Sequence, residues 1–476
     1  MGAIPEKECI IMMKKMKRLI ALLMTMAMVM GMGVTAFAAG NVTIQVTNAE
    51  NATFKYVQVI RPNPKKVTGW EFVKSGYAQK YITAFEANDD QDAIKKLIEN
   101  GDGSSSEVAA ALSGIVNEYK DDFKEMGNPQ DVNSAGIYAI IAEEAGYTYN
   151  NMAAYVGFGP VSGGTYPKLT SAVLEAKKTP TTVTKQVTDE DKVVAVGDIL
   201  TYTIKTKVPY IDPNNNDRTF KITDTLTGAK YYLTGEGAQA SIQMGSEQVF
   251  AGAEKFVMTN NSFSIDLSEL ILNNNANAGK DIIVTYTVKV TEVDEITNTA
   301  GSHISGVKVD SKPEVNVYTG TITLTKFDAD NESKKLAGAG FEVKKAGSDE
   351  ALTFTGDNGV YTYDPTGGST EVFTGNEGTL VLKGLDLGTY NFKETTAPEG
   401  YHIANKEGGV DVSATLALGE GMTEATATVT AAAELANSKL SALPSTGGIG
   451  TTIFTIAGCA IMIAAAGLFF ATRKRA

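Results

Sequence analysis

Cysteine and histidine are nearly absent from this chain of 476 residues, which contains only Cys9, Cys459, His303 and His402. So few sulfur and imidazole groups exclude a His/Cys zinc centre, a haem and a disulfide-stapled scaffold, and no metal or cofactor is expected. Basic residues are also outnumbered. The chain has 42 Lys and Arg against 55 Asp and Glu, a net charge of −13. We expect no nucleic-acid partner, because phosphate binding needs a basic face.

Residues 1–39 have the order of a secretory signal peptide. An apolar run at 19–34 is followed by the small-x-small site Ala36-Phe37-Ala38-Ala39, and signal peptides combine such a run with a basic start and a cleavage site. The basic residues that precede the run are Lys14, Lys15, Lys17 and Arg18. We therefore expect residues 1–39 to be removed on export; an N-terminal membrane anchor is the alternative.

A second processing signal is predicted at 441–476. The motif Leu443-Pro444-Ser445-Thr446-Gly447 precedes an apolar run at about 449–471 and a basic tail. The run is long enough to cross a bilayer, with the basic tail on the cytoplasmic side. The motif resembles the LPxTG cell-wall sorting signal of Gram-positive bacteria. This resemblance implies that a sortase recognises Leu443 and Pro444, cleaves between Thr446 and Gly447, and holds the Thr446 carbonyl as a thioester.

Both cysteines would leave with the processed ends of the chain. Processing would remove 8 of the 42 basic and 2 of the 55 acidic residues, which leaves a net charge of −19. An exported, acidic chain without disulfides needs another source of stability.

Composition divides the rest of the chain into segments at 40–178, 179–319 and 320–440. The first begins with strand-like alternation at 42–46 and 54–56 and continues with helical patterns, so an α+β domain is expected. The predicted helices are Asp92–Glu99, Ser106–Tyr119 and Ala135–Glu144.

The second and third segments alternate apolar and polar residues with a period of two and have Asn/Gly turns between the runs. This pattern is typical of antiparallel β-sandwiches with one buried and one wet face per sheet. The predicted strands include Leu200–Ile204, Ile282–Val290, Thr321–Lys326, Gly340–Val343, Thr379–Leu382 and Tyr390–Glu394.

Six polar residues fall on strand faces that are otherwise apolar. Side chains two positions apart share one face of a strand. In each of the last two segments this spacing places one lysine, one acid and one asparagine among apolar neighbours, with the lysine on the first strand and the asparagine on the last. These residues are Lys185, Asp224 and Asn298 in the second segment and Lys326, Glu394 and Asn437 in the third.

Such a set has a definite chemistry. Burial of an isolated charge is expensive, and a dry site lowers the pKa of a lysine and raises that of a carboxyl group. The neutral amine can then attack the asparagine carbonyl while the protonated acid polarises it and moves protons. Loss of ammonia leaves a Lys–Asn isopeptide bond. The alternative is that some of these residues are exposed on edge strands.

A known family carries the same arrangement. The sequence YNFKETTAPEGY at 390–401 resembles the E-box (YxLxETxAPxGY) of sortase-assembled pilins, with Phe392 in place of the usual leucine. The third segment is similar to a Cna-B domain. The second, with ITDTL at 222–226 and ITNTA at 296–300, resembles the middle domain of major pilins. The resemblance implies a mainly β protein of tandem Ig-like (Cna-type) β-sandwich domains, whose first domain is α+β with helical insertions.

The resemblance also implies specific covalent links. Within the chain it implies two isopeptide bonds, Lys185–Asn298 with Asp224 as the catalytic acid and Lys326–Asn437 with Glu394. Between chains, Tyr166-Pro167-Lys168 resembles the last three residues, YPK, of the pilin motif. The lysine of that motif attacks the sortase-bound threonine of the next subunit. The upstream Trp/Val half of that motif is not recognisable. Lys177 and Lys178 remain the alternatives to Lys168.

The sequence thus predicts a structural shaft subunit of a covalent fimbrium, secreted and anchored to the cell wall. The expected partners are other copies of the chain, pilus-specific and housekeeping sortases and peptidoglycan; minor pilins and host surface ligands remain open. The alternatives are a wall-anchored monomeric adhesin or a minor pilin. No external catalysis is expected, because no nucleophile-elbow sequence is present.

Two smaller expectations complete this interpretation. Load along a fibre would enter at Lys168 and leave at Thr446, so the first segment, which shows no clear Lys/acid/Asn set, is expected to lack an isopeptide bond. Asp212-x-Asn214-x-Asn216 resembles the start of a calcium loop, but Asp217 stands at the required Gly and Thr223 at the closing Glu, which favours a turn.

Overall fold

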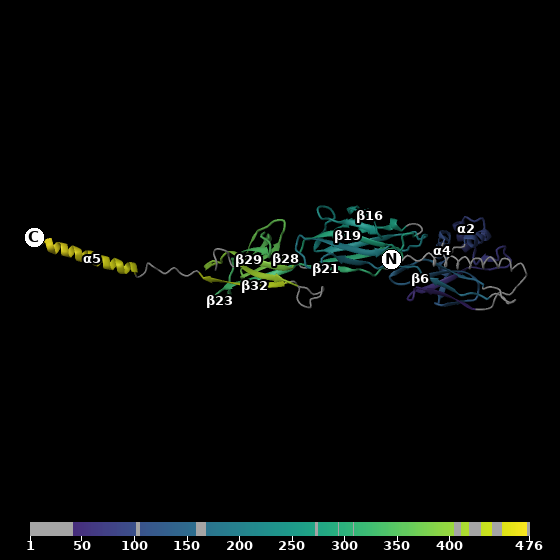
Figure 1. Cartoon of the computed structure of the whole chain (residues 1–476), viewed down its shortest axis with the longest axis horizontal. Coiled ribbons are helices and arrows are strands. Elements are labelled where there is room, and N and C mark those ends of the chain that lie inside the picture. Colours follow the sequence, from purple (N-terminus) through teal and green to yellow (C-terminus); the bar gives the residue numbers. More distant parts are fainter. Residues whose placement is uncertain are drawn as a thin grey trace. The chain divides into compact units, whose positions relative to one another are not determined.

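The computed structural model describes residues 41–100, 105–158, 168–271, 275–293, 295–307, 309–403, 411–417, 430–439 and 450–473 (Figure 1). They form two compact units. The larger contains the first segment and most of the middle segment. The smaller contains residues 192–198, 292–295 and the chain from Val317 onward. The predicted signal peptide and the LPxTG motif lie outside the described residues.

Two sheets and a separate strand pair form the β part of the first segment. The first sheet has the order β3 (Trp70–Phe72), β2 (Thr53–Pro62), β6 (Gly136–Glu143) and β8 (Met152–Val156), and β4 (Lys124–Met126) pairs with β2. The second has the order β5 (Gln130–Val132), β1 (Val42–Thr47) and β9 (Ala172–Glu175). The separate pair is β7 (Tyr147–Tyr149) with β10 (Lys178–Pro180).

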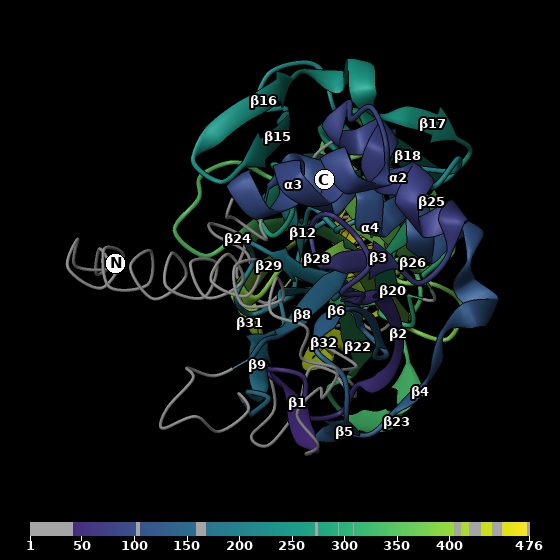
Figure 2. The same ribbon diagram turned by 90° about the vertical axis from the view of Figure 1, so that its right-hand side faces the viewer.

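Three helices gather on one side of the sheet that contains β6, and β1 lies on its other side (Figure 2). They are α2 (Ser75–Phe85), α3 (Asp90–Asn100) and α4 (Ser106–Glu118), and the 3-10 turn η2 (Lys120–Asp122) follows. The Ser105 side chain caps α4 by accepting the backbone N–H of Val108. The helices predicted at Asp92–Glu99 and Ser106–Tyr119 are therefore confirmed.

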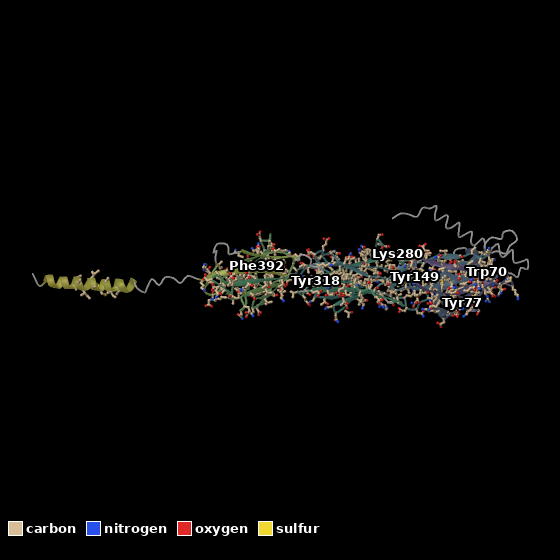
Figure 3. All side chains as sticks on the ribbon, turned by 90° about the horizontal axis from the view of Figure 1, so that it is seen from below. Trp70, Tyr77, Tyr149, Lys280, Tyr318 and Phe392 are labelled. Carbon is tan, nitrogen blue, oxygen red and sulfur yellow. The ribbon has the colours of Figure 1, made fainter. Side chains whose placement is uncertain are left out.

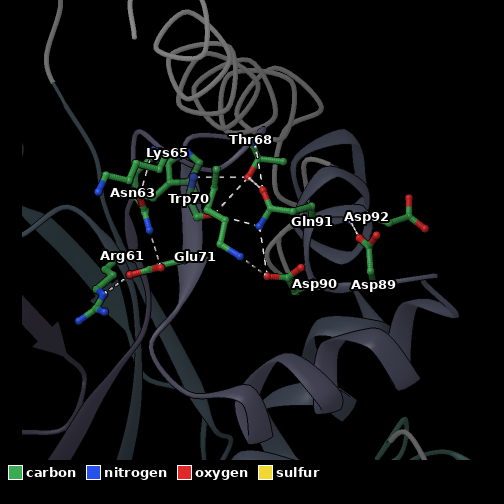
Figure 4. Close-up of polar contacts among 11 residues, drawn as sticks. Arg61, Asn63, Lys65, Thr68, Trp70, Glu71, Asp89, Asp90, Gln91 and Asp92 are labelled. Atoms are coloured by element: carbon green, nitrogen blue, oxygen red, sulfur yellow. Dashed lines mark hydrogen bonds and ion pairs between the residues drawn. The ribbon is translucent and has the colours of Figure 1, made fainter. Parts of the chain in front are cut away.

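A polar network joins the start of α3 to the loop between β2 and β3 (Figure 4). Asp89 Oδ1 accepts the backbone N–H of Asp92 at 2.8 Å and so satisfies one of the free donors of the first turn. Gln91 accepts from Thr68 Oγ1 at 2.8 Å and donates to the carbonyl of Trp70 at 3.2 Å. These bonds hold the helix against the edge strand β3.

The helix predicted at Ala135–Glu144 is wrong, because these residues form the central strand β6. Ile137 and Ile141 pack with the helices, whereas Tyr138 and Ile140 pack in the core around β1. A strand buried on both faces loses the apolar/polar alternation, and a short continuous apolar run does not distinguish strand from helix.

The middle segment contains two sheets whose inner faces contact each other. In the first, β11 (Thr184–Val187), β12 (Ile199–Lys207), β19 (Asp281–Val290), β15 (Ala240–Met244) and β16 (Glu247–Ala251) follow in order, and β14 (Ala229–Tyr231) pairs with β19. In the second the order is β17 (Val257–Thr259), β18 (Ser262–Asp266), β13 (Phe220–Thr227), β20 (Glu295–Ile304) and β21 (Glu314–Tyr318). Tyr286 of β19 and Phe263 of β18 meet edge to face, with ring centres 5.0 Å apart.

The C-terminal segment has the same plan. One sheet has the order β25 (Phe354–Asp357), β26 (Val360–Tyr363), β28 (Thr379–Leu385), β22 (Gly320–Asp328), β32 (Thr430–Lys439) and β30 (Tyr401–His402), with β23 (Asn331–Lys335) paired to β22. The other has the order β27 (Glu371–Phe373), β24 (Gly340–Lys345), β29 (Gly388–Thr396) and β31 (Asp411–Leu416). Phe392, labelled in Figure 3, packs against Phe341 in the core between them.

The mainly β fold class is confirmed, and the strands predicted in both later segments all form. The final element is helix α5 (Gly450–Arg473). The prediction that the run at about 449–471 crosses a membrane is not supported, because no helix in the described parts of the chain is both long and apolar enough to span one.

Candidate functional site

The first candidate site lies inside the C-terminal segment, where the first and last strands are neighbours. β22 and β32 run parallel, and their register places Lys326 opposite Leu435 and Asp328 opposite Asn437. Ile322, Leu324 and Lys326 alternate inward along β22 and are each 0% exposed. The predicted lysine thus belongs to the core face of its strand.

Lys326, Glu394 and Asn437 meet in this core. The Lys326 ammonium contacts Asn437 Oδ1 and lies 3.7 Å from Glu394 Oε1, while Asn437 Nδ2 donates to the same Glu394 oxygen at 2.8 Å. The side chains of Lys326 and Glu394 are both fully buried. Glu394 comes from β29, in the sheet that faces β22 and β32, so the acid reaches both partners from across the core.

The electrostatics of this site favour neutral groups. Burial lowers the pKa of Lys326 to about 8, although the Glu394 charge acts in the opposite direction. Burial also raises the pKa of Glu394, against the effect of Lys326 and the Asn437 amide. An amine and a protonated acid are what nucleophilic attack on the asparagine carbonyl requires.

The second candidate site lies between the two sheets of the middle segment. Lys185 comes from β11 in one sheet, whereas Asp224 and Asn298 come from β13 and β20 in the other. The Lys185 and Asp224 side chains are fully buried and contact each other, and Asn298 is 0% exposed. A bond between Lys185 and Asn298 would therefore join two sheets, whereas a bond between Lys326 and Asn437 would join adjacent strands of one sheet.

Burial dominates the charges here as well. It lowers the pKa of Lys185 to about 8, with the Asp224 charge opposing the shift. It raises the pKa of Asp224, although Lys185 and the hydroxyl of Tyr231 counteract the change. Within the described residues Asn298 Oδ1 has no hydrogen-bond partner, so the carbonyl that would be attacked is not held by a competing donor.

Sequence reasoning missed several tyrosines at these sites. Tyr286 of β19 accepts from Lys185 Nζ at 2.6 Å and from Asn298 Nδ2 at 3.1 Å, and Tyr231 donates to Asp224 Oδ1 at 2.8 Å. In the C-terminal segment Tyr401 donates to Asp328 at 2.8 Å. Aromatic residues in strands are ordinarily core residues, so only the E-box pattern, which ends at Tyr401, could have singled out one of them.

The candidate linking lysines differ in their surroundings. Lys168 is exposed and directly follows the undescribed residues 159–167, and Lys177 is exposed in the connection between β9 and β10. Lys178 is engaged: its ammonium lies 3.3 Å from Glu144 Oε2 and 4.4 Å from the centre of the Tyr147 ring. Of the sortase residues, Leu443, Pro444, Thr446 and Gly447 lie outside the described part of the chain.

The calcium-like motif forms a turn. Asp212 Oδ1 accepts the backbone N–H of Asn214 at 2.9 Å, and Asp212 also binds Ser113 and the amides of Asn117 and Asn151. Protein donors thus surround this carboxylate and link α4 and the β7–β8 loop to the middle segment. Among the described residues, no group of three His, Cys, Asp or Glu is placed to hold a metal.

Family models match two parts of the chain. Residues 320–420 match the SpaA family model, a prealbumin-like fold domain, and residues 436–476 match the model of the LPXTG cell wall anchor motif. No significant match to a curated protein sequence is found.

Several solved pilin structures match this chain, and the first of them shares its fold. The T6 backbone pilin of Streptococcus pyogenes serotype M6 is 14% identical, with 85% of this chain and 100% of that chain covered and a TM-score of 0.55. The major pilin SpaD of Corynebacterium diphtheriae is 19% identical, with 85% and 98% covered and a TM-score of 0.49. The pilus 2b backbone protein of group B streptococcus is 25% identical, with 55% and 99% covered and a TM-score of 0.40.

The two family models and the T6 fold confirm the resemblance that the motifs indicated. The chain combines a SpaA-type prealbumin-like domain with the fold of a Gram-positive backbone pilin, and its LPXTG anchor motif places it outside the cell, attached to the wall.

Proposed function

We propose that this protein is the shaft subunit of a covalent surface pilus, polymerised by sortase from Thr446 to Lys168 of the next subunit. The observation that carries the proposal is the buried set of Lys326, Glu394 and Asn437, in a domain that precedes a matched LPXTG anchor. A fully buried lysine beside an amide has little value for stability alone, because its desolvation offsets its contacts. It has a clear value when the two groups react.

Each intramolecular bond forms when a lysine amine replaces the side-chain amide nitrogen of an asparagine, which leaves as ammonia. In the C-terminal domain the Lys326 ammonium first gives a proton to Glu394, and its neutral nitrogen then attacks Cγ of Asn437. The Nζ–Cγ bond forms, the Cγ–Nδ2 bond breaks, and one proton passes from Nζ to Nδ2 so that ammonia leaves. Lys185, Asp224 and Asn298 would react in the same way in the middle domain.

The bond between subunits needs an accessible amine and an activated acyl group. Sortase would release Gly447 and hold the Thr446 carbonyl, and an exposed lysine of a second copy would attack it. Lys168 is exposed, whereas the ammonium of Lys178 is held by Glu144 and Tyr147. Lys178 would have to leave Glu144 and Tyr147 to approach the enzyme-bound carbonyl, whereas Lys168 would not. This difference favours Lys168 over Lys178.

The proposal is tested by expressing the chain in a Gram-positive host that carries a pilus sortase and probing wall extracts by immunoblot. A ladder that resists SDS and heat is expected, and Lys168→Ala should reduce it to a single wall-anchored species. Lys177→Ala is the matched control, since it removes an exposed lysine nine positions along, and should leave the ladder intact. A native chain that appears only as single copies would instead identify a monomeric adhesin.

A further inference from the structure

The two proposed isopeptide sites differ in which group touches the nitrogen that leaves. In the C-terminal domain Glu394 Oε1 lies 3.7 Å from Lys326 Nζ and accepts from Asn437 Nδ2 at 2.8 Å. One carboxyl group therefore contacts both the attacking amine and the departing amide. It can collect a proton at one nitrogen and deliver it at the other.

The acid of the middle domain does not reach as far. Asp224 is one methylene shorter than Glu394; it contacts Lys185 Nζ, and its other oxygen accepts from Tyr231 at 2.8 Å. In this fully described region no hydrogen bond joins Asp224 to Asn298. The Asp224 carboxyl is therefore placed to take a proton from the amine but not to hand one to the amide nitrogen.

The hydroxyl of Tyr286 makes the contact with Asn298 that Asp224 does not make. It accepts from Lys185 Nζ at 2.6 Å and from Asn298 Nδ2 at 3.1 Å, so it touches both nitrogens whose protons must change. The ring is 0% exposed and is held between Tyr202, stacked at 5.9 Å, and the edge of Phe263 at 5.0 Å. Such packing fixes the hydroxyl in one place, as a positioned proton-transfer group requires.

We propose that Tyr286 is a catalytic residue of the middle-domain cross-link and relays a proton from Lys185 to Asn298, a transfer that Glu394 performs alone in the C-terminal domain. As the Nζ–Cγ bond forms, the Tyr286 oxygen takes a proton from Nζ and its own hydroxyl proton passes to Nδ2. The Cγ–Nδ2 bond breaks, ammonia leaves and the phenol is restored. Asp224 keeps the proton that it took from the ammonium at the start.

The environment of Tyr286 favours a neutral phenol that exchanges protons over an ionised phenolate. Burial raises the pKa of Tyr286 well above its ordinary value, and the neighbouring Asp224 adds to this effect. The phenol therefore stays neutral near neutral pH, where a hydroxyl can act as donor and acceptor at once.

The inference rests on the proposed function, and its test separates the two. The full-length chain is recovered unfolded from inclusion bodies, its unlinked mass is confirmed, and it is refolded by dilution. The branched tryptic peptide of each domain is then quantified over time by mass spectrometry. In Tyr286→Phe we expect the Lys185–Asn298 link to form about 100-fold more slowly, as loss of a positioned acid–base group typically costs. The Lys326–Asn437 link in the same molecules is the internal control and should form at the native rate.

A second variant excludes a purely structural effect. Adding Asp224→Glu to Tyr286→Phe lengthens the acid by one methylene and reproduces the arrangement of Glu394, so the middle link should return. The relay alone would be overturned if the middle link formed at the native rate in Tyr286→Phe. It would also be overturned if the double variant resisted trypsin as well as the native chain does, and so was folded, but still formed the middle link slowly. Absence of both links in the native chain would overturn the proposed function, and the relay with it.

Discussion

Replacement of Lys326 by methionine isolates the contribution of one covalent bond to stability. The unbranched side chain keeps nearly the same length and suits the buried site, but it has no amine that could attack Asn437. The native bond would close a loop of 111 residues. In the chain-entropy model such a closure is worth about 5 kcal/mol, so Lys326→Met should destabilise the C-terminal domain by about that amount.

Calorimetry of the secreted chain is the appropriate assay, because separate domains unfold in separate transitions. A loss of about 5 kcal/mol should lower the C-terminal transition by roughly 15–25 °C and leave the middle-domain transition in place. Intact mass supplies the control, since Lys326→Met should keep the Asn437 ammonia that the native chain loses. If that ammonia is retained and the C-terminal transition does not move, the bond does not stabilise the fold and the reasoning fails.

Three further outcomes follow from the same geometry. The mature native chain should weigh two ammonia masses less than its sequence, and a third loss would show a bond in the first segment. When unlinked chain from inclusion bodies is refolded, the Lys326–Asn437 link should form fastest between the raised pKa of Glu394 and about pH 8, where Lys326 and Glu394 share one proton. Above the pKa of Lys326, about 8, that proton is lost and the rate should fall about tenfold per pH unit. Below the pKa of Glu394 both groups are protonated, the amine cannot attack, and the rate should fall again. A rate that keeps rising above pH 9 would contradict the need for a protonated acid. Lys178→Ala should leave polymerisation intact and cost about 1–3 kcal/mol by thermal unfolding, because its pair with Glu144 is largely buried while the Tyr149 hydroxyl still donates to Glu144.

The burial of the proposed reacting residues could be predicted from the sequence, because strand alternation is a local property; the family resemblance then assigned their roles. Lys326 and Glu394 each share a face with apolar residues two positions away, and that spacing alone predicts burial. The role of Tyr286 could not be predicted in this way. It depends on how far β19 stands from β13 and β20 across the core, and no pattern within one strand encodes that distance.

Burial on both faces explains the error in the first segment. β6 lies between a helical layer and a second sheet, so Ile137 and Tyr138 are both core residues although they point in opposite directions. Without a wet face the period of two disappears.

Helix α2 was missed because its local sequence does not favour a helix. Ser75 and Gly76 at its start are weak helix formers, and the helix is stabilised by the packing of Tyr77 and Tyr81, which are 0% exposed.

The topology of the C-terminal domain explains why the proposed bond would join its first and last strands. The chain enters at Gly320 on β22 and leaves at Lys439 on β32, and the two strands are parallel neighbours. Tension between these ends would shear the strands past each other and load their hydrogen bonds. A bond from Lys326 to Asn437 carries the force across after six residues of β22 and leaves only two residues of β32 under load. The strands between them, which include β29 with Glu394, would then lie outside the loaded path, so the domain would hold a proposed fibre without relying on its own folding free energy.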